Sequence, residues 1–211
     1  MNQIQKRGLL ITLEGIDGSG KSTLAKAIVA ALTALGKPVV LTKEPGGTAL
    51  GTELRAILQT QKNPVCNKAE FLLFAADRAQ HFKQLIVPAL EQGQIVISDR
   101  MADSSLAYQG YGRGIDRNMI TTINSWAMQG IVPDLTIFLR LTPEQALARA
   151  LDRHETLWTI EQEKIDFWQR VADGYEHIFA GRENVVALDA MQPVAILCEQ
   201  AMKRISELQK I

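Results

Sequence analysis

The feature that most constrains this chain is a glycine-rich segment that lies between a short apolar run and an amphipathic one. Residues 15–22 read Gly-Ile-Asp-Gly-Ser-Gly-Lys-Ser, which fits the pattern G-x-x-x-x-G-K-[ST] at every position. Residues 9–13 before it have the pattern of a buried strand, and residues 22–35 after it have that of a helix. Glycines at such a junction let backbone N–H groups turn toward phosphate oxygens, and the helix N-terminus also favours an anion. The segment therefore predicts a phosphate loop that binds a nucleoside triphosphate.

Individual residues of this loop have distinct expected roles. We expect Lys21 to contact the β- and γ-phosphates and the hydroxyl of Ser22 to be a ligand of Mg²⁺. The alternative is a glycine-rich turn with an incidental lysine, and the complete match between a strand and a helix argues against it. The residues of this segment expected to bind ATP are Gly15, Ile16, Asp17, Gly18, Ser19, Gly20, Lys21, Ser22 and Thr23.

Short apolar runs alternate with helical patterns along the rest of the chain. The apolar runs contain few polar positions, as expected for strands that are covered on both faces. This alternation predicts an α/β fold of the P-loop kinase type, with a five-stranded parallel sheet and helices on both faces. Because no linker or repeat interrupts the pattern, we expect one domain over residues 1–211. The further strands are expected at residues 38–41, 95–98, 135–139 and 185–188, and the further helices at residues 68–91, 117–128, 143–151, 160–180 and 193–209.

Composition and charge argue against several kinds of partner. The 211 residues include 23 Lys and Arg and 23 Asp and Glu, so the formal net charge is zero. A chain without a large basic field is not expected to bind a nucleic acid or an anionic membrane. No apolar run approaches the ~20 residues of a membrane-spanning helix, and the first residues lack the apolar core of a signal peptide. Cys66 and Cys198 match no metal or redox spacing, so we expect a cytoplasmic protein with both thiols free.

Polar residues follow two of the predicted strands. Ligands gather at the carboxyl ends of parallel strands, so Asp99 and Arg100 are expected to lie near the phosphate loop. Asp99 suits Mg²⁺ and its water, and Arg100 suits the phosphates between donor and acceptor; an exposed ion pair is the alternative. Residues 44–48 read Glu-Pro-Gly-Gly-Thr and predict either a preshaped loop at the same edge or a plain surface turn.

Two further segments have both a binding and a structural interpretation. Phe74 and Arg78 are one helical turn apart and share a face, so a ring beside a guanidinium would suit a nucleobase. The spacing alone favours the alternative, in which Phe71 and Phe74 belong to the core. Residues 103–110 add hydroxyls and an amide, which suit either contacts to a sugar or base or the capping of a helix.

The phosphate loop by itself does not name a reaction, because switches, motors and kinases share it. A regulatory GTPase carries an N-K-x-D segment, whereas residues 67–70 read Asn-Lys-Ala-Glu and open a helix. The basic or aromatic tracks of a DNA motor are also missing from the sequence. A kinase for a small acceptor is the better interpretation, and a nucleotide switch or partner-binding ATPase is the rival from another class.

Six segments in order resemble the thymidylate kinase family. They read EGIDGSGKST, EPGGT, FLLFAADRAQHF, SDRMADSSLAYQG, PDLTIFL and IEQEKIDFW, and they extend over nearly the whole chain. The resemblance implies transfer of a phosphoryl group from Mg-ATP to thymidine monophosphate (dTMP), which supplies dTTP synthesis, and a homodimer. The nearest rival is another nucleoside monophosphate kinase with the same chemistry and a different base pocket.

The resemblance also implies roles for residues on the acceptor side. Phe74 looks like the ring that stacks on thymine, and Arg78 and Gln109 look like contacts to the edge of the base. Arg55 and Arg100 look like cations on the acceptor phosphate. The other residues that the resemblance puts near dTMP are Asp17, Glu44, Ser105 and Tyr108.

A lid is the last element that the resemblance implies. Gly18 stands where one subgroup of the family has an arginine, which is similar to the bacterial subgroup whose lid supplies that cation. We expect the lid over about residues 149–161, with Arg149 beside ATP and Arg153 as the catalytic arginine. The family's usual D-R-x-E is replaced at residues 158–161 by Trp-Thr-Ile-Glu. The expected catalytic residues are therefore Lys21, Arg100 and Arg153.

Overall fold

The computed structural model describes residues 7–59, 65–152 and 163–209. In these residues five strands form one sheet in the order β2-β3-β1-β4-β5, and every neighbouring pair is parallel. The predicted α/β fold with a five-stranded parallel sheet is confirmed, and the strand ends differ from the predicted ends by at most two residues. The strands are β1 (Leu10–Glu14), β2 (Val39–Lys43), β3 (Ile95–Asp99), β4 (Leu135–Arg140) and β5 (Val185–Asp189).

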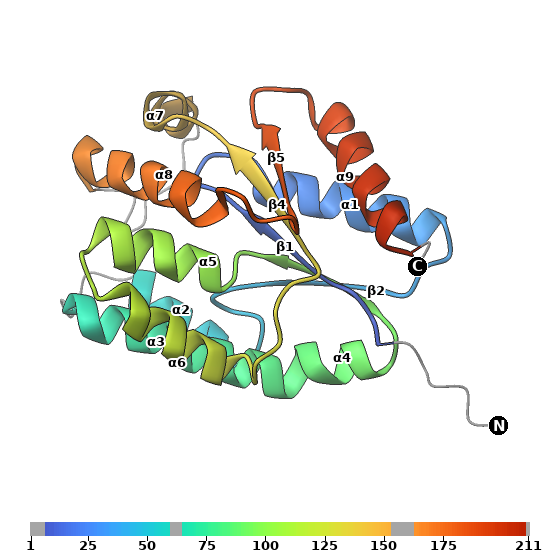
Figure 1. Cartoon of the computed structure of the whole chain (residues 1–211), viewed down its shortest axis with the longest axis horizontal. Coiled ribbons are helices and arrows are strands. Elements are labelled where there is room, and N and C mark those ends of the chain that lie inside the picture. The colour runs from blue at the N-terminus through green and yellow to red at the C-terminus, as the bar shows by residue number, and fades with distance from the viewer. Residues whose placement is uncertain (1–6, 60–64, 153–162, 210–211) are drawn as a thin grey trace.

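Helices cover both faces of this sheet (Figure 1). α1 (Lys21–Ala34) and α9 (Val194–Gln209) lie side by side on one face, and α3 (Asn67–His81), α4 (Val87–Glu91) and α6 (Arg117–Ala127) lie on the other. Within the described parts of the chain, none of the helices has the length and apolar character needed to cross a membrane. The remaining elements are α2 (Ala49–Gln59), α5 (Ala102–Ser105), α7 (Pro143–Asp152), α8 (Ile165–Phe179) and two π-helical segments, η1 (Phe82–Ile86) and η2 (Leu106–Gly112).

Residues 67–91 form one continuous helical stretch made of α3, η1 and α4. The sequence predicts that Pro88 kinks or ends this helix, and the expectation of an end is wrong, because the helix continues to Glu91. Proline has no N–H to donate to the carbonyl four residues earlier, and its ring crowds that carbonyl. The wider turn of η1 just before Pro88 changes this hydrogen-bonding pattern, which lets the helix continue through the proline.

Two helical regions were not predicted from the sequence. One is α2, which begins after Thr48, whose hydroxyl accepts a hydrogen bond from the N–H of Gly51 at 3.0 Å and so caps the helix. The other is α5 with η2, where the sequence offered capping and turn formation as one of two alternatives. The helix expected from residue 160 begins at Ile165 in the described part of the chain, since Lys164 has an extended backbone.

The sheet has an apolar core on each face. Ile11 and Leu13 of β1 belong to the larger cluster, together with residues of α1 and α9. Leu10 of β1 and Val96 of β3 point to the opposite face, where they pack with residues of η1 and α4, including Phe82. Alternate residues of β1 therefore contribute to different cores, as the two-residue period of a strand requires.

The second face is polar near the carboxyl ends of its strands. The register pairs Thr12 with Ser98 and with Thr136, and it pairs Ser98 with Thr42, so four buried hydroxyl side chains form a row across the sheet. Thr12 donates to Thr136 with 3.1 Å between the two Oγ1 atoms, and Oγ1 of Thr42 lies 2.6 Å from Nε2 of His81. This row lies just below the sheet edge at which the functional site is built.

Candidate functional site

Three strand ends meet at one edge of the sheet. β1, β3 and β2 are neighbours, and the register places Asp99 beside both Leu13 and Lys43. Because the strands are parallel, the segments that follow them leave the sheet at the same edge. Residues 15–20, Arg100 and the loop at residues 44–48 therefore lie together, as their positions in the sequence suggest.

The phosphate loop connects β1 to the N-terminus of α1. Gly15 has a φ of 139°, and a Cβ at this position would lie 2.5 Å from the carbonyl oxygen of Leu139, so only glycine fits. The buried ammonium of Lys21 donates to the carbonyl oxygens of Gly15 at 3.0 Å and Ile16 at 2.8 Å. Burial lowers the pKa of Lys21 to about 8, and the positive charge of Arg100 adds to this effect. The loop thus holds a cation at the start of a helix.

Ser22 and Asp99 connect the phosphate loop to the end of β3. The hydroxyl of Ser22 donates a hydrogen bond to Oδ2 of Asp99. Hydroxyl and carboxylate oxygens are ligands that Mg²⁺ prefers, and Mg²⁺ usually takes one or two of them together with nucleotide phosphates and water. The described residues contain no group of three or more His, Cys, Asp or Glu side chains that would hold a metal ion by themselves. The pair therefore fits the Mg²⁺ of a nucleotide complex.

The side chain of Arg100 lies between the phosphate loop and η2. Nη2 forms an ion pair with Oδ1 of Asp17 and donates to the hydroxyl of Tyr108 at 3.1 Å. The Tyr108 hydroxyl in turn donates to Oδ2 of Asp17 at 3.0 Å. Burial by itself would raise the pKa of Asp17, but the positive charges of Arg100 and Lys21 outweigh it and lower that pKa. Asp17 is therefore held ionised beside the guanidinium.

The backbone of Arg100 is strained. Its φ of 73° lies in the left-handed region, which costs a non-glycine residue about 1–2 kcal/mol. Its N–H donates to the carbonyl oxygen of Leu13 at 3.0 Å, and its own carbonyl oxygen accepts from the hydroxyl of Ser98 at 2.8 Å. Backbone strain that is held by specific partners often marks a functional position.

The guanidinium of Arg78 is buried in a polar cluster at the C-terminal end of α3. Nε donates to Oε2 of Glu44 at 2.8 Å, and Nη1 donates to Oδ1 of Asn124 at 2.6 Å and to Oγ of Ser105 at 3.2 Å. Oε1 of Glu44 lies 3.0 Å from Nδ1 of His81. Burial raises the pKa of Glu44, but the attraction of Arg78 and His81 is stronger and lowers it overall. In this structure Glu44 and Ser105 therefore hold Arg78 in place.

Asp77 lies beside this cluster and supports the loop at residues 44–48. Oδ1 accepts a hydrogen bond from the N–H of Gly46 at 3.1 Å, whereas Oδ2 has no hydrogen-bond partner among the described residues. α2 packs directly on the carboxylate, since a Cβ at Gly51 would lie 2.2 Å from Oδ1. Burial and the negative charge of Glu44 raise the pKa of Asp77 to about 6. The carboxyl group is thus incompletely bonded and easily protonated.

The other predicted acceptor residues lie around the same region. Phe74 is half-buried and packs against the larger core, so its ring has both a packed part and an accessible part. Gln109 is buried, and its amide donates to Oε1 of Glu70 at 2.9 Å. Arg55 reaches the loop at residues 44–48, where Nη1 donates to the carbonyl oxygen of Pro45 at 2.9 Å.

On the donor side, Arg149 of α7 reaches the phosphate loop. Nη1 donates to the carbonyl oxygen of Gly18 at 3.2 Å, and Nη2 donates to that of Ala190, after β5, at 2.8 Å. Thr23 is exposed in the first turn of α1. Arg153 lies outside the described residues.

Several polar residues of the site were missed at the sequence level. Glu14 was assigned no role, although an acidic residue at the end of an otherwise apolar strand is a usable signal. Asp77 and His81 follow Phe74 and Arg78 at helical spacing, which also suggests a polar helix face. Ser104 belongs to residues 103–110, whose hydroxyls the sequence does single out, although not as partners of Glu14. Asn124 and Tyr175 give no local signal, because they come from distant elements.

The fold and the site together define a P-loop kinase. A phosphate loop faces a strand end that carries an aspartate and an arginine, and the polar cluster around the buried Arg78 lies beside it. Cations on both sides of a strand end suit a phosphorylated acceptor next to the nucleotide donor.

Comparison with known proteins identifies the family. A sequence model described as Thymidylate kinase matches residues 13–201. The thymidylate kinase of Halothermothrix orenii is 48% identical over 186 residues, which cover 87% of this chain and 89% of that protein. The thymidylate kinase of Carboxydothermus hydrogenoformans is 47% identical over 169 residues, covering 80% of this chain and 83% of that protein. That of Leifsonia xyli subsp. xyli is 44% identical over 187 residues, with 89% of each chain covered. This chain therefore belongs to the thymidylate kinase family.

Proposed function

We propose that this protein transfers the γ-phosphoryl group of Mg-ATP to dTMP, which yields ADP and thymidine diphosphate. Membership of the thymidylate kinase family supports this activity. The structural observation that carries it is the ion pair of Asp17 with Arg100, because this pair joins the phosphate loop to the end of β3 beside the polar cluster around Arg78. Arg100 is thereby held between the donor side and the acceptor side.

The reaction needs no general base. The acceptor is already a phosphate anion near neutral pH, so no side chain has to remove a proton to make it nucleophilic. In-line phosphoryl transfer then depends on alignment of the two substrates and on neutralisation of the charge that spreads over the transferred group. We assign this neutralisation to Lys21 and Arg100, and we assign a further contribution to Arg153.

On the donor side, the phosphate loop binds the phosphates of ATP through its backbone N–H groups and Lys21. Ser22 and Asp99 hold Mg²⁺, which neutralises negative charge on the phosphates when it is bound. Arg149 supports the donor site from α7, since it already bonds the carbonyl oxygen of Gly18. A segment at about residues 149–161 acts as the lid.

On the acceptor side, Phe74 stacks on thymine, and Arg78 and Gln109 contact the edge of the base. The buried position of Arg78 supports this role, because a guanidinium fixed by three partners is preorganised for a ligand. Arg55 and Arg100 bind the acceptor phosphate. Asp17, Glu44, Ser105 and Tyr108 complete the acceptor site.

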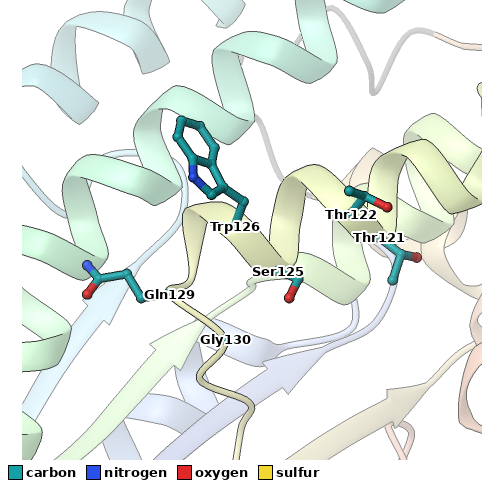
Figure 2. A pocket seen from close by; sticks show the side chains of 6 residues that line it. All are labelled: Thr121, Thr122, Ser125, Trp126, Gln129 and Gly130. Carbon is teal, nitrogen blue, oxygen red and sulfur yellow. The ribbon is translucent and has the colours of Figure 1, made fainter.

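We further propose that the protein is a single-domain homodimer. Adjacent helices on one side of the molecule carry exposed apolar side chains, namely Leu50 of α2, Leu72 of α3 and Trp126 of α6. Trp126 is 81% exposed and projects from α6 at an open hollow (Figure 2). Burial of such side chains favours association. The hollow is lined by Thr121, Thr122, Ser125, Trp126, Gln129 and Gly130.

Sedimentation analysis tests the dimer. Trp126→Glu should raise the dissociation constant about tenfold or more, because a central aromatic anchor at an interface is typically worth over 1 kcal/mol. Met191→Glu, a control at another exposed apolar residue, should leave it unchanged. A wild-type protein that stays monomeric at micromolar concentration would exclude the homodimer.

We also propose that the protein works in the cytoplasm. Cys66 and Cys198 are both free in the structure, which suits a reducing compartment. Fractionation of cells that express the tagged protein tests this assignment.

The activity is tested by measuring ADP release from Mg-ATP with dTMP and with the deoxyuridine, adenosine, cytidine and guanosine monophosphates offered separately. We expect strong stimulation by dTMP and little by the others, and Arg100→Ala should lower the rate on the order of 10³-fold. Stimulation by a different monophosphate would keep the chemistry and overturn the base assignment. Slow hydrolysis that ignores every monophosphate would favour a nucleotide switch.

A further inference from the structure

Glu14 is a fully buried carboxylate that none of the roles above uses. It ends β1, directly before the phosphate loop. Oε1 accepts a hydrogen bond from the N–H of Met101 at 2.8 Å, and Oε2 accepts from the hydroxyls of Ser104 at 2.5 Å and Tyr175 at 3.0 Å. These donors belong to different parts of the fold, since Ser104 is on α5 and Tyr175 is on α8. The carboxylate of Glu14 therefore connects the end of β1 to α5, to α8 and to the residue that precedes α5.

The same two hydroxyls also contact the guanidinium of Arg100. Nη1 of Arg100 donates to Oγ of Ser104 at 3.0 Å, to the hydroxyl of Tyr175 at 3.3 Å and to the carbonyl oxygen of Gly15 at 3.0 Å. An arginine has no acceptor atom, so Ser104 and Tyr175 must accept from it. Each hydroxyl has one hydrogen, which it can donate to Oε2 of Glu14, and the two hydroxyl oxygens also lie 2.9 Å from each other. Arg100 therefore donates hydrogen bonds to the two hydroxyls, and the two hydroxyls donate hydrogen bonds to Glu14.

We propose that Glu14 is a positioning residue for Arg100 and acts on it through Ser104 and Tyr175. Asp17 and Tyr108 fix Nη2 of this guanidinium, and the Glu14 network fixes Nη1. Held from both sides, the guanidinium keeps one orientation without having to rearrange during the reaction. The catalytic consequence rests on the proposed function of Arg100, whereas the orientation of its side chain does not.

The charges around Glu14 make this network sensitive to pH. Burial and the negative charge of Asp103 raise the pKa of Glu14 to about 7, while the Ser104 hydrogen bond and Arg100 act in the opposite direction. Below that pH Glu14 becomes protonated, so its oxygen gains a hydrogen and no longer accepts from both hydroxyls. Several charged and titratable groups face Glu14, its hydroxyl partners or Arg100. They are Lys21 and Asp17 of the phosphate loop region, Arg100 after β3, Asp103 of α5 with its partner Arg182, Tyr108 of η2 and Tyr175 of α8.

The sign of the expected pH dependence follows from the raised pKa. Ionised Glu14 holds Arg100, and with a pKa of about 7 the carboxylate is half ionised at that pH and nearly fully ionised about one pH unit higher. The kcat of the wild type should therefore fall between pH 8 and pH 6.5 by more than the titration of the substrates explains. An uncharged amide at position 14 has no proton to gain, so the Glu14→Gln variant should lack this additional fall.

The kinetic test uses Glu14→Gln, Tyr175→Phe and the double variant, with Glu176→Gln as the control. Glu176 has a carboxylate like Glu14 and follows Tyr175 on α8, but its side chain is exposed and pairs with Arg140. At pH 8 we expect Glu14→Gln to lower kcat about tenfold or more while the KM for Mg-ATP changes less than twofold, and Tyr175→Phe to lower kcat in the same direction. The double variant should lose little more than the larger single loss, because both changes act on one guanidinium. Glu176→Gln should match the wild type.

NMR spectroscopy tests the orientation of the Arg100 guanidinium independently of activity. At pH 8 the guanidinium N–H signals of Arg100, assigned by comparison with Arg100→Lys, should be separately resolved in the wild type, because the side chain is held. They should merge in Glu14→Gln and in Tyr175→Phe. A wild type that transfers no phosphoryl group but shows this difference would overturn the proposed function and support the positioning role. Unchanged signals or an unchanged kcat in a folded Glu14→Gln would overturn the inference, and Tyr175→Phe decides in the same way if Glu14→Gln does not fold.

Discussion

The guanidinium of Arg78 and the carboxylate of Glu44 form a buried ion pair, with Nε and Oε2 2.8 Å apart and each side chain only 2% exposed. Neither charge is solvated, so each depends on its partner and on the hydrogen bonds around the pair. Arg140 and Glu176 also form an ion pair, with 2.6 Å between Nε and Oε1, but these side chains are 59% and 47% exposed. The two pairs have similar geometry and different surroundings, which makes them a matched comparison.

Removal of one partner should therefore have a very different effect at the two sites. Glu44→Ala leaves a buried guanidinium without its counter-charge and should lower the free energy of unfolding by about 3–5 kcal/mol. Glu176→Ala should lower it by about 0–1 kcal/mol, because water solvates the remaining Arg140. Urea unfolding at one protein concentration measures both changes. Equal losses would show that Arg78 does not depend on Glu44.

Asp77→Asn should stabilise the protein at neutral pH. The pKa of Asp77 is raised from its ordinary 3.8 to about 6, so the folded state binds its proton more tightly than the unfolded state does. The folded state therefore loses stability as the pH rises from about 4 through 6, and above 6 the full cost is present. We expect Asp77→Asn to raise the unfolding free energy by about 1–3 kcal/mol at pH 7.5 and by less at pH 5. A gain that is larger at pH 5 would contradict this sign.

The affinity for ATP should fall at alkaline pH. Phosphates bind the charged ammonium of Lys21, and burial lowers the pKa of this group to about 8. The charged form is therefore abundant in the free protein at pH 7 and scarce at pH 9. Calorimetric titration should show an affinity for Mg-ATP about tenfold lower at pH 9 than at pH 7. Lys21→Arg keeps its charge over this range, so a variant that still binds should lack the dependence, and a flat wild-type profile would place the pKa of Lys21 above 9.

Phe74→Ala should weaken dTMP binding by about 1–3 kcal/mol, the usual contribution of an aromatic ring that stacks on a base. The affinity for Mg-ATP should not change, because this ring belongs to the acceptor side. Lys68→Ala, at an exposed position of the same helix, is the control. If calorimetry gives the same dTMP affinity for Phe74→Ala and the wild type, the ring is a core residue only.

Arg153→Ala should lower kcat on the order of 10³-fold while the affinity for dTMP stays nearly constant, as for a catalytic arginine that acts on the transferred group. Arg149→Ala is the informative comparison, since Arg149 bonds the phosphate loop directly and should affect the KM for ATP as well. An unchanged kcat in Arg153→Ala would remove this residue from the mechanism.

Local patterns were sufficient to predict much of the fold. The strand ends were predicted within two residues, because the central strands β1, β3 and β4 are buried on both faces and are nearly continuous apolar runs. α2 was missed because Thr48 caps it directly after the Pro-Gly-Gly turn, so the segment was interpreted only as a loop. The outcome at Pro88 could not be predicted, because a proline pattern does not reveal that the preceding turn is π-helical.

The candidate site was predictable where chemistry follows a strand end. Asp99 ends β3 and Arg100 follows it, and both lie beside the phosphate loop, with Ser22 and Asp17 as their partners. The residues that hold these side chains in place were not predictable in the same way. Tyr175 reaches Glu14 from 161 positions along the chain, and no local pattern encodes that contact.

The left-handed backbone of Arg100 has a consequence for protein engineering. Glycine at this position would relieve backbone strain of about 1–2 kcal/mol, but it would also remove the guanidinium that Asp17 and Tyr108 hold. Loss of this largely buried ion pair and of the hydrogen bonds around it outweighs that gain. A design rule that replaces every left-handed residue by glycine should therefore exempt position 100, because the side chain holds the strained backbone in place.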